Sequence, residues 1–173
     1  TSVSDMLELA IMLKEVGLVD AEKARVQIVP LFETIEDLDH SEETMRKYFS
    51  LPLAKKWIAS KNNYQEIMLG YSDSSKDAGP TSATLALHSA QERIAKWAES
   101  HDIDLTLFHG RGGAVGRGGG PANRAVLAQP VGSVKCRFKL TEQGEVIFAR
   151  YGNPVLAIRH VESVAAATLL QSA

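Results

Sequence analysis

Short apolar runs alternate with longer stretches of helical periodicity through the middle of the chain. The runs have the length and composition of buried strands and cover residues 26–32, 66–71 and 104–108. Apolar residues recur at helical spacing in the intervening segments 41–49, 53–60 and 81–100. Strands that alternate with helices indicate an α/β fold with a parallel sheet, and the even repeat favours part of a helix-rich (β/α)8, TIM-type barrel. A doubly wound open sheet is the alternative.

Helical periodicity also marks both ends of the sequence. The first helix is expected over residues 6–13, with Ser4 or Asp5 as its N-cap and Gly17 at its C-terminal stop. Residues 161–170 are helical and apolar and run almost to the last residue. Because domains usually end in polar tails, and because the sequence does not begin with Met, we expect the chain to be part of a longer protein.

Two further segments carry specific expectations. Residues 135–148 are expected to form an extended pair that turns around residues 142–144. The helix over 81–100 is expected to turn one stripe of side chains inward, namely Leu85, Leu87, His88, Gln91, Ile94, Ala95 and Ala98.

Composition places the chain among ordinary globular proteins. Of its 173 residues 45% are apolar, and 19 basic against 21 acidic residues leave a net charge of −2, which excludes bulk disorder and argues against nucleic acid as a partner. No apolar run approaches the roughly 18 residues of a membrane helix, so no membrane span is expected. The single Cys136 cannot form an internal disulfide, which fits a reducing, cytoplasmic compartment. We expect one segment, residues 1–173, without an internal domain boundary.

Polar and charged residues follow all three predicted strands, where a parallel β/α layout places its chemistry. Glu33 and Asp73 are the first acidic residues after the first and second strands. Two carboxylates from adjacent strand ends can hold a hard divalent cation through oxygen and leave the remaining positions to water or substrate. The alternative is structural, with Glu33 capping a helix and Asp73 in a Ser/Asp turn.

A glycine-rich segment follows the third strand. Seven of the 13 glycines fall between residues 110 and 120, interleaved with Arg111 and Arg117. Glycine lets backbone N–H groups approach an anion, and arginine offers a planar fork to phosphate or carboxylate, so the segment predicts an oxyanion cradle. A flexible linker or an RGG-type nucleic-acid segment is the alternative, and the dinucleotide fingerprint and the Walker motif are both absent. Of the five histidines, His109 alone directly follows a predicted strand, so it is the histidine expected at the site.

Three long motifs in this order resemble phosphoenolpyruvate carboxylase, and the similarity is to the bacterial-type enzyme. They are the blocks PLFET with Asp37-Leu38 at residues 30–38, GYSDSSKDAG at residues 70–79 and FHGRGGAVGRGGGP at residues 108–121. Shorter matches, TEQGE and YGNP, occupy residues 141–145 and 151–154. The departures are Ser75, where the family often has Gly or Ala, and Pro80, where Arg is common; Pro80 should sharpen the start of the helix that follows.

The resemblance implies a lyase that joins bicarbonate to phosphoenolpyruvate and releases oxaloacetate and phosphate. It implies Glu33 and Asp73 as ligands of Mg²⁺ or Mn²⁺. It also implies catalytic roles for Arg111, Arg117 and His109, with Arg111 on the substrate phosphate and Arg117 at the carboxylation step and near the aspartate-inhibition site. Substrate binding is further assigned by the resemblance to Lys76, Gly112 and Gly113.

The resemblance also implies what these residues lack. The family's catalytic histidine, in a Thr-Ala-His-Pro-Thr block, does not occur in this sequence, so the segment alone is expected to be inactive. The rest of the same enzyme chain, assembled as a homotetramer, would complete the site. A fragment that folds without activity, and the phosphate-binding part of a different α/β barrel enzyme, are the alternatives.

Overall fold

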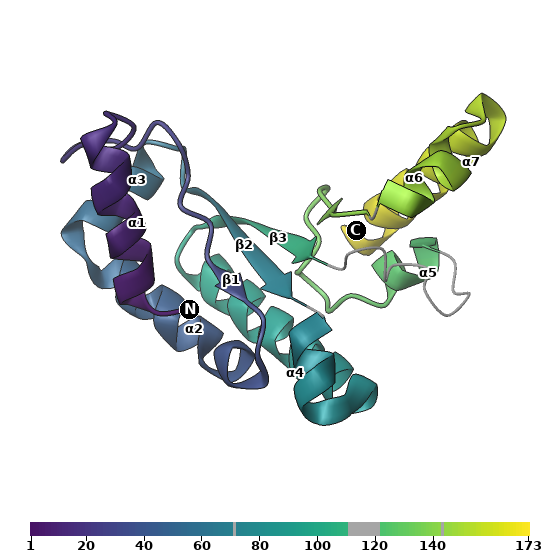
Figure 1. The fold of residues 1–173 in the computed structure, drawn as a ribbon, viewed down its shortest axis with the longest axis horizontal. Coiled ribbons are helices and arrows are strands. Elements are labelled where there is room, and N and C mark those ends of the chain that lie inside the picture. Colours follow the sequence, from purple (N-terminus) through teal and green to yellow (C-terminus); the bar gives the residue numbers. More distant parts are fainter. Residues whose placement is uncertain (71, 111–121, 143) are drawn as a thin grey trace.

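Four parallel strands form one sheet whose spatial order follows the sequence. The computed structural model describes residues 1–70, 72–110, 122–142 and 144–173. The sheet runs in the order β1-β2-β3-β4, and each neighbouring pair is parallel; Figure 1 shows the first three strands. The strands are β1 (Leu31–Phe32), β2 (Tyr64–Gly70), β3 (Asp104–Gly110) and β4 (Lys139–Leu140). A parallel sheet with sequential strand order and intervening helices confirms the α/β prediction and is compatible with part of a barrel.

The first strand is shorter than its apolar run predicts. Residues 26–30 run along β2, but the side chain of Gln27 replaces part of the backbone ladder there. Its Nε2 donates to the Tyr64 carbonyl at 2.5 Å, and its Oε1 accepts from the Glu66 N–H at 3.1 Å. Regular pairing therefore begins only at Leu31, which lies opposite Met68.

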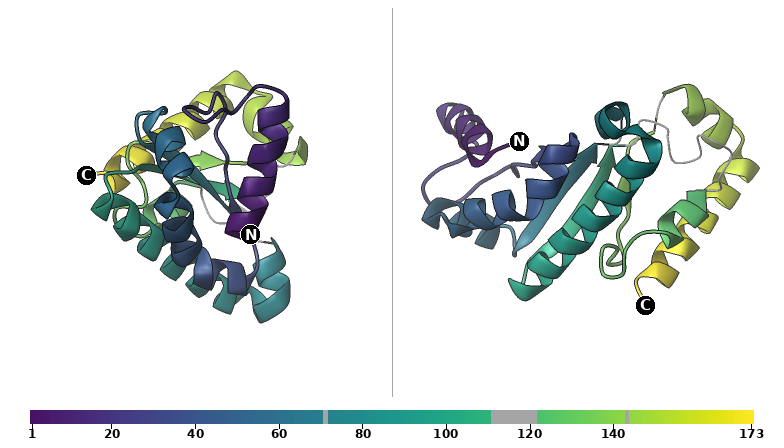
Figure 2. Two further views of the ribbon diagram at one scale, coloured as in Figure 1. Left: turned by 90° about the vertical axis from the view of Figure 1, so that its left-hand side faces the viewer. Right: turned by 90° about the horizontal axis from the view of Figure 1, so that it is seen from below.

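Some of the helices cover one face of the sheet and close the hydrophobic core, and others lie beyond its last strand. The helices are α1 (Val3–Glu15), α2 (Ile35–Ser50), α3 (Pro52–Ala59), α4 (Ser72–Ser100), α5 (Ala122–Leu127), α6 (Gly144–Tyr151) and α7 (Pro154–Gln171). Helices α2 and α4 pack side by side along the sheet, whereas α5, α6 and α7 gather beyond β4 (Figure 2). None of the helices that the structure describes is long and apolar enough to cross a membrane. The core is built mainly from Phe32, Leu38, Met45, Ile67, Leu69, Ile94, Ala98, Leu105 and Leu107.

Helix α1 confirms the predicted stop and corrects the predicted start. Ser2, rather than Ser4 or Asp5, is the N-cap: Asp5 lies at the third helical position, and the two residues form a reciprocal capping box. At the other end Gly17 has φ +72°, its N–H donates to the Lys14 carbonyl, and the next N–H donates to the Leu13 carbonyl. This is the pattern of a Schellman motif, which favours glycine at this position.

Helix α4 begins earlier than predicted and is kinked. Residues 72–78 are helical, Gly79 has non-helical backbone angles of φ 80° and ψ 161°, and the longer part of the helix starts at Pro80. Two members of the predicted inward stripe, Leu85 and His88, are exposed. Leu85 and Leu87 are two residues apart and cannot face the same way on a helix. The buried positions instead include Ala83, Leu87, Ala90, Gln91, Ile94, Ala95, Trp97 and Ala98.

The expected extended pair over residues 135–148 is wrong. Among the described residues of this segment, only Lys139 and Leu140 form a strand, and they pair in parallel with Phe108 and His109 of β3. Residues from Gly144 onward are helical, and Ile147 and Tyr151, spaced by one turn, line one cavity together. The segment completes another β/α unit rather than a hairpin.

Candidate active site

The parallel strands bring their carboxyl ends to one edge of the sheet, as the sequence predicts. Glu33 follows β1, the first turn of α4 follows β2 within two residues, and Gly110 ends β3. Thr141 follows β4 and is tied to the end of β3, because its N–H donates to the His109 carbonyl at 3.1 Å. Four strand exits therefore share this edge.

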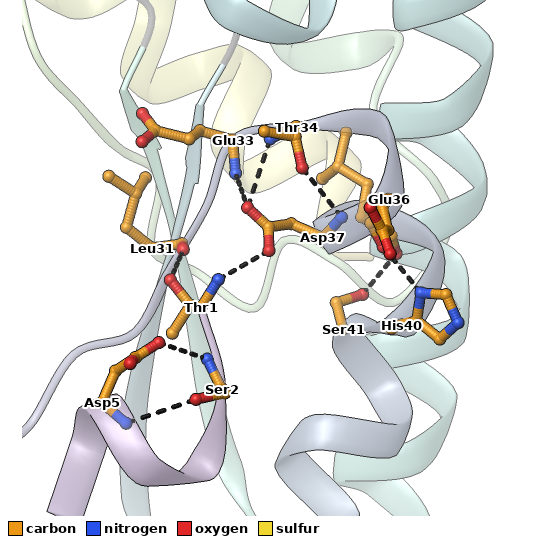
Figure 3. Close-up of polar contacts among 11 residues, drawn as sticks. Thr1, Ser2, Asp5, Leu31, Glu33, Thr34, Glu36, Asp37, His40 and Ser41 are labelled. Carbon is orange, nitrogen blue, oxygen red and sulfur yellow. Dashed lines mark hydrogen bonds and ion pairs between the residues drawn. The ribbon is translucent and has the colours of Figure 1, made fainter.

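Glu33 presents a carboxylate at this edge from a firmly held backbone. Its N–H and that of Thr34 point to Asp37 Oδ2 at 3.5 and 3.4 Å, and the Asp37 N–H donates to Thr34 Oγ1 at 3.0 Å. This capping box starts helix α2. The Glu33 side chain extends away from the box (Figure 3), and among the described residues no hydrogen bond or ion pair reaches its carboxylate. Thr34, not Glu33, is therefore the helix cap.

The electrostatics of the capping box are those of an ionised carboxylate. Burial raises the pKa of Asp37, whereas the hydrogen bonds that its carboxylate accepts from the Thr34 and Glu33 N–H groups lower it. Asp37 is therefore charged at neutral pH and committed to its N–H partners. Asp37 has little capacity left for a ligand, whereas no contact to the Glu33 carboxylate comes from the described part of the chain.

Asp73 and Lys76 lie in the first turns of α4, directly after β2. The backbone of both residues is helical, so the Ser/Asp turn considered for Asp73 is wrong. Their side chains lie outside the described part of the chain. The placement of Asp73 at the same sheet edge as Glu33 agrees with the predicted pair, and its role as a ligand stays a prediction.

The glycine-rich segment lies outside the described residues. It includes Arg111, Arg117, Gly112 and Gly113, which the sequence predicts at the substrate. The structure fixes only the two points between which the segment runs, Gly110 at the end of β3 and Ala122 at the start of α5. The predicted roles of these four residues stay predictions.

His109 is buried behind the strand end. Its neighbour across the sheet is Leu69 of β2, and the neighbour of Leu69 on the other side is Phe32 of β1. All three side chains are almost completely buried. Its ring stacks on Phe138 with centroids 4.7 Å apart. This row faces the opposite side of the sheet from the next one, where Gly70 lies opposite Gly110. The geometry favours a supporting position for His109, and its assignment as a catalytic residue stays a prediction.

A charged cluster at the end of β4 escaped the sequence reasoning. Glu142 Oε1 accepts from Arg150 at 2.6 Å and lies 3.7 Å from His160 Nε2, while its Oε2 is buried with no partner among the described residues. Burial and the neighbouring Glu142 raise the pKa of Tyr151. The cluster borders a cavity of about 780 Å³ between β4 and helices α5–α7. The sequence does carry a signal for this cluster. Polar Thr141 and acidic Glu142 follow the apolar Leu140, in the same way as acidic Glu33 follows Phe32 at the end of the first strand.

Comparison of the sequence with known protein families identifies the family of this chain. The family model described as phosphoenolpyruvate carboxylase matches residues 1–173, the whole chain. The chain belongs to the phosphoenolpyruvate carboxylase family. This membership confirms the resemblance of the three motifs, and it supports a carboxy-lyase that acts on phosphoenolpyruvate and bicarbonate.

The residues at the edge fit the divalent metal that phosphoenolpyruvate carboxylases use. Glu33 offers a partly exposed carboxylate that no described side chain pairs with, and hard cations such as Mg²⁺ take oxygen ligands of this kind. Among the described residues no group of three or more His, Cys, Asp or Glu side chains converges on one point. A site with only one or two carboxylates is typical of Mg²⁺, which retains water and binds substrate oxygens.

Proposed function

We propose that this segment supplies the metal-binding and phosphate-binding part of the active site of a phosphoenolpyruvate carboxylase. The observation that carries the proposal is the match of the whole chain to the family. The geometry supports it, because Glu33, the first turn of α4 and the start of the glycine-rich segment meet at one sheet edge. The four strands and their helices would form part of a (β/α)8 barrel completed by the rest of the enzyme chain.

In this proposal the acidic residues bind the cation and the basic residues bind the substrate anions. Glu33 and Asp73 would hold Mg²⁺ or Mn²⁺, which would supply Lewis-acid stabilisation of the enolate oxygen. Arg111 binds the phosphate of phosphoenolpyruvate and neutralises its charge, which allows a bicarbonate oxygen to attack phosphorus while the enolate–phosphorus bond breaks. The resulting carboxyphosphate and enolate combine, as the carboxyl group moves to carbon and phosphate leaves. Gly112 and Gly113 let backbone N–H groups approach the anion.

The remaining site residues act around this core. Arg117 orients the carboxyphosphate for transfer and couples the site to inhibition by aspartate. Lys76 adds positive charge from the first turns of α4, and His109 supports the end of β3 from behind. Proton transfer falls to a histidine supplied by another part of the enzyme, so residues 1–173 alone form no oxaloacetate. The working enzyme is a cytoplasmic homotetramer.

The test is a metal titration of the complete enzyme carrying single substitutions. Glu33→Gln and Asp73→Asn each replace a charged oxygen ligand by a neutral one, so each should raise the Mn²⁺ concentration for half-maximal activity by about tenfold or more. Glu36→Gln is the matched control, because Glu36 is an exposed carboxylate three residues from Glu33. An unchanged Mn²⁺ requirement in both ligand variants, with the fold intact by circular dichroism, would reject the assignment.

A further inference from the structure

The end of β2 approaches the end of β1 more closely than any side chain allows. A Cβ atom placed on Gly70 would lie 2.4 Å from Glu33 Cβ and 2.9 Å from Glu33 Cα. Neither atom is the end of a flexible side chain, so a methyl group at residue 70 could be accommodated only by moving Glu33 itself. The absence of a side chain at Gly70 therefore fixes where Glu33 lies.

Glu33 is held from its other side as well. Asp37 Oδ2 takes up the N–H groups of Glu33 and Thr34, and Thr34 Oγ1 closes the capping box that starts α2 (Figure 3). A displacement of Glu33 would strain or break these hydrogen bonds. Glu33 is thus confined between the edge of β2 and the first turn of a helix.

We propose that Gly70 is a positioning residue for the Glu33 carboxylate and, through it, for divalent-cation binding. The inference rests on the proposed metal role of Glu33. The glycine at the end of β3 gives a comparison. A Cβ on Gly110 would meet the flexible end of the Met68 side chain at 2.7 Å and the Leu69 carbonyl at 3.1 Å, but no residue of the candidate site. The close approach to a proposed metal ligand is therefore specific to Gly70 of these two. Among the glycines that the structure describes, Gly70 is the one whose missing side chain makes room for a proposed ligand.

The expected consequence is a loss of metal affinity larger than the loss of turnover. Mg²⁺ and Mn²⁺ hold their ligands at short, well-defined distances, and a change in the groups that orient a metal ligand typically costs about 10- to 100-fold in metal affinity. Gly70→Ala in the complete enzyme should therefore raise the Kd for Mn²⁺ by about tenfold or more. At saturating Mn²⁺ the kcat should recover to within about threefold of the parent, because the substrate-binding arginines are untouched.

The experiment is a double-mutant cycle read out by direct Mn²⁺ binding, with free Mn²⁺ measured by electron paramagnetic resonance. The variants are Gly70→Ala, Glu33→Gln and their combination. If Gly70 acts through Glu33, Gly70→Ala weakens Mn²⁺ binding in the parent but adds no further loss in the Glu33→Gln background. Equal losses in both backgrounds would overturn the positioning role. The control is Gly144→Ala, since a Cβ at Gly144 meets open space.

The same cycle separates this inference from the proposed function. If Glu33→Gln leaves Mn²⁺ binding unchanged, the metal role of Glu33 fails; if only Gly70→Ala leaves it unchanged, the positioning role fails. Should Gly70→Ala not fold by circular dichroism, Asp37→Asn provides a second route, because it loosens Glu33 from the opposite side without added volume. It should weaken Mn²⁺ binding about threefold, again only when Glu33 is present, and an equal effect in the Glu33→Gln background would overturn the inference.

Discussion

At the scale of single residues, charge alone does not define a ligand. Asp37 and Glu33 are both acidic, both partly buried and four positions apart, yet Asp37 accepts backbone N–H groups while the Glu33 carboxylate extends toward the sheet edge (Figure 3). The difference follows from the fold, because the capping box consumes one carboxylate and leaves the other. A side chain whose hydrogen bonds are satisfied by the backbone has little left for a ligand.

The two arginines of the glycine-rich segment should be separable by their products. Arg111→Ala should raise the KM for phosphoenolpyruvate and lower kcat/KM by about 30- to 1,000-fold, since a bidentate charge-assisted contact in a dry site contributes roughly 2–4 kcal/mol. Arg117→Ala should spare phosphoenolpyruvate binding but damage carboxylation, so that bicarbonate-dependent release of pyruvate and phosphate persists. Lysine should rescue either position poorly, because it lacks the planar fork.

Paired assays of oxaloacetate and pyruvate on the complete enzyme measure this division. Arg124→Ala is the control, because Arg124 is an exposed arginine of α5 just beyond the same segment. Identical losses of both products and of both kinetic constants in the two variants would show that Arg111 and Arg117 share one role.

At the scale of elements, β1, β2 and β3 lie within apolar runs that predict strands, whereas β4 does not. The patterns at 66–71 and 104–108 identify β2 and β3; buried residues alternate with half-buried ones in β2, whereas residues 105–107 of β3 are all buried. Strand β4 has two residues and no apolar run of its own. It is a strand because it pairs with Phe108 and His109, and the sequence of residues 139–140 does not show that pairing. The sequence places the site at the strand ends. It does not predict the Glu142 cluster, because it does not predict β4.

The kink in α4 should be needed to place the first turns of that helix. Gly79 has φ 80° and ψ 161°, a region that is essentially closed to residues with a Cβ. Gly79→Ala should therefore destabilise the protein by about 1–3 kcal/mol and should raise the Mn²⁺ requirement, because residues 72–78 carry Asp73. Thermal unfolding and an Mn²⁺ titration of the complete enzyme measure the two effects. Ser89→Ala, at an exposed position of α4, should change neither, and an unaltered Gly79→Ala variant would refute the claim.

At the scale of the whole molecule, the face of the sheet opposite helices α2 and α4 is polar. Glu66 on β2 accepts from Tyr64 at 2.6 Å and from Lys139 at 2.7 Å, while Arg137 donates to Thr106 at 2.9 Å and pairs with Asp104. These contacts join β2, β3 and the approach to β4. In a closed barrel this face would become the interior, so ion pairs would take the place of part of the usual apolar filling.

The Glu66 contacts should make the sheet sensitive to acid. Burial raises the pKa of Glu66, but the hydrogen bonds from Lys139 and Tyr64 outweigh it, and the pKa lies below its ordinary value of 4.5. Because the folded-state pKa is lowered, the stabilisation is complete above the unfolded-state pKa and is lost as the pH falls through the folded-state pKa. Glu66→Gln should accordingly loosen the sheet at pH 7 and make little difference at a pH low enough to protonate Glu66.

Hydrogen–deuterium exchange of the complete enzyme tests this dependence locally. Comparison of variant and parent at each pH cancels the intrinsic effect of pH on exchange. Peptides that cover β2 and β4 should exchange about fivefold faster in Glu66→Gln at neutral pH, corresponding to ~1 kcal/mol for a partly screened pair, and the difference should shrink as the pH is lowered. Glu92→Gln, which removes an exposed pair with Lys96 on α4, should leave these peptides unchanged. A difference that persists undiminished at low pH would show that the volume or geometry of Glu66, and not its charge, holds the strands together.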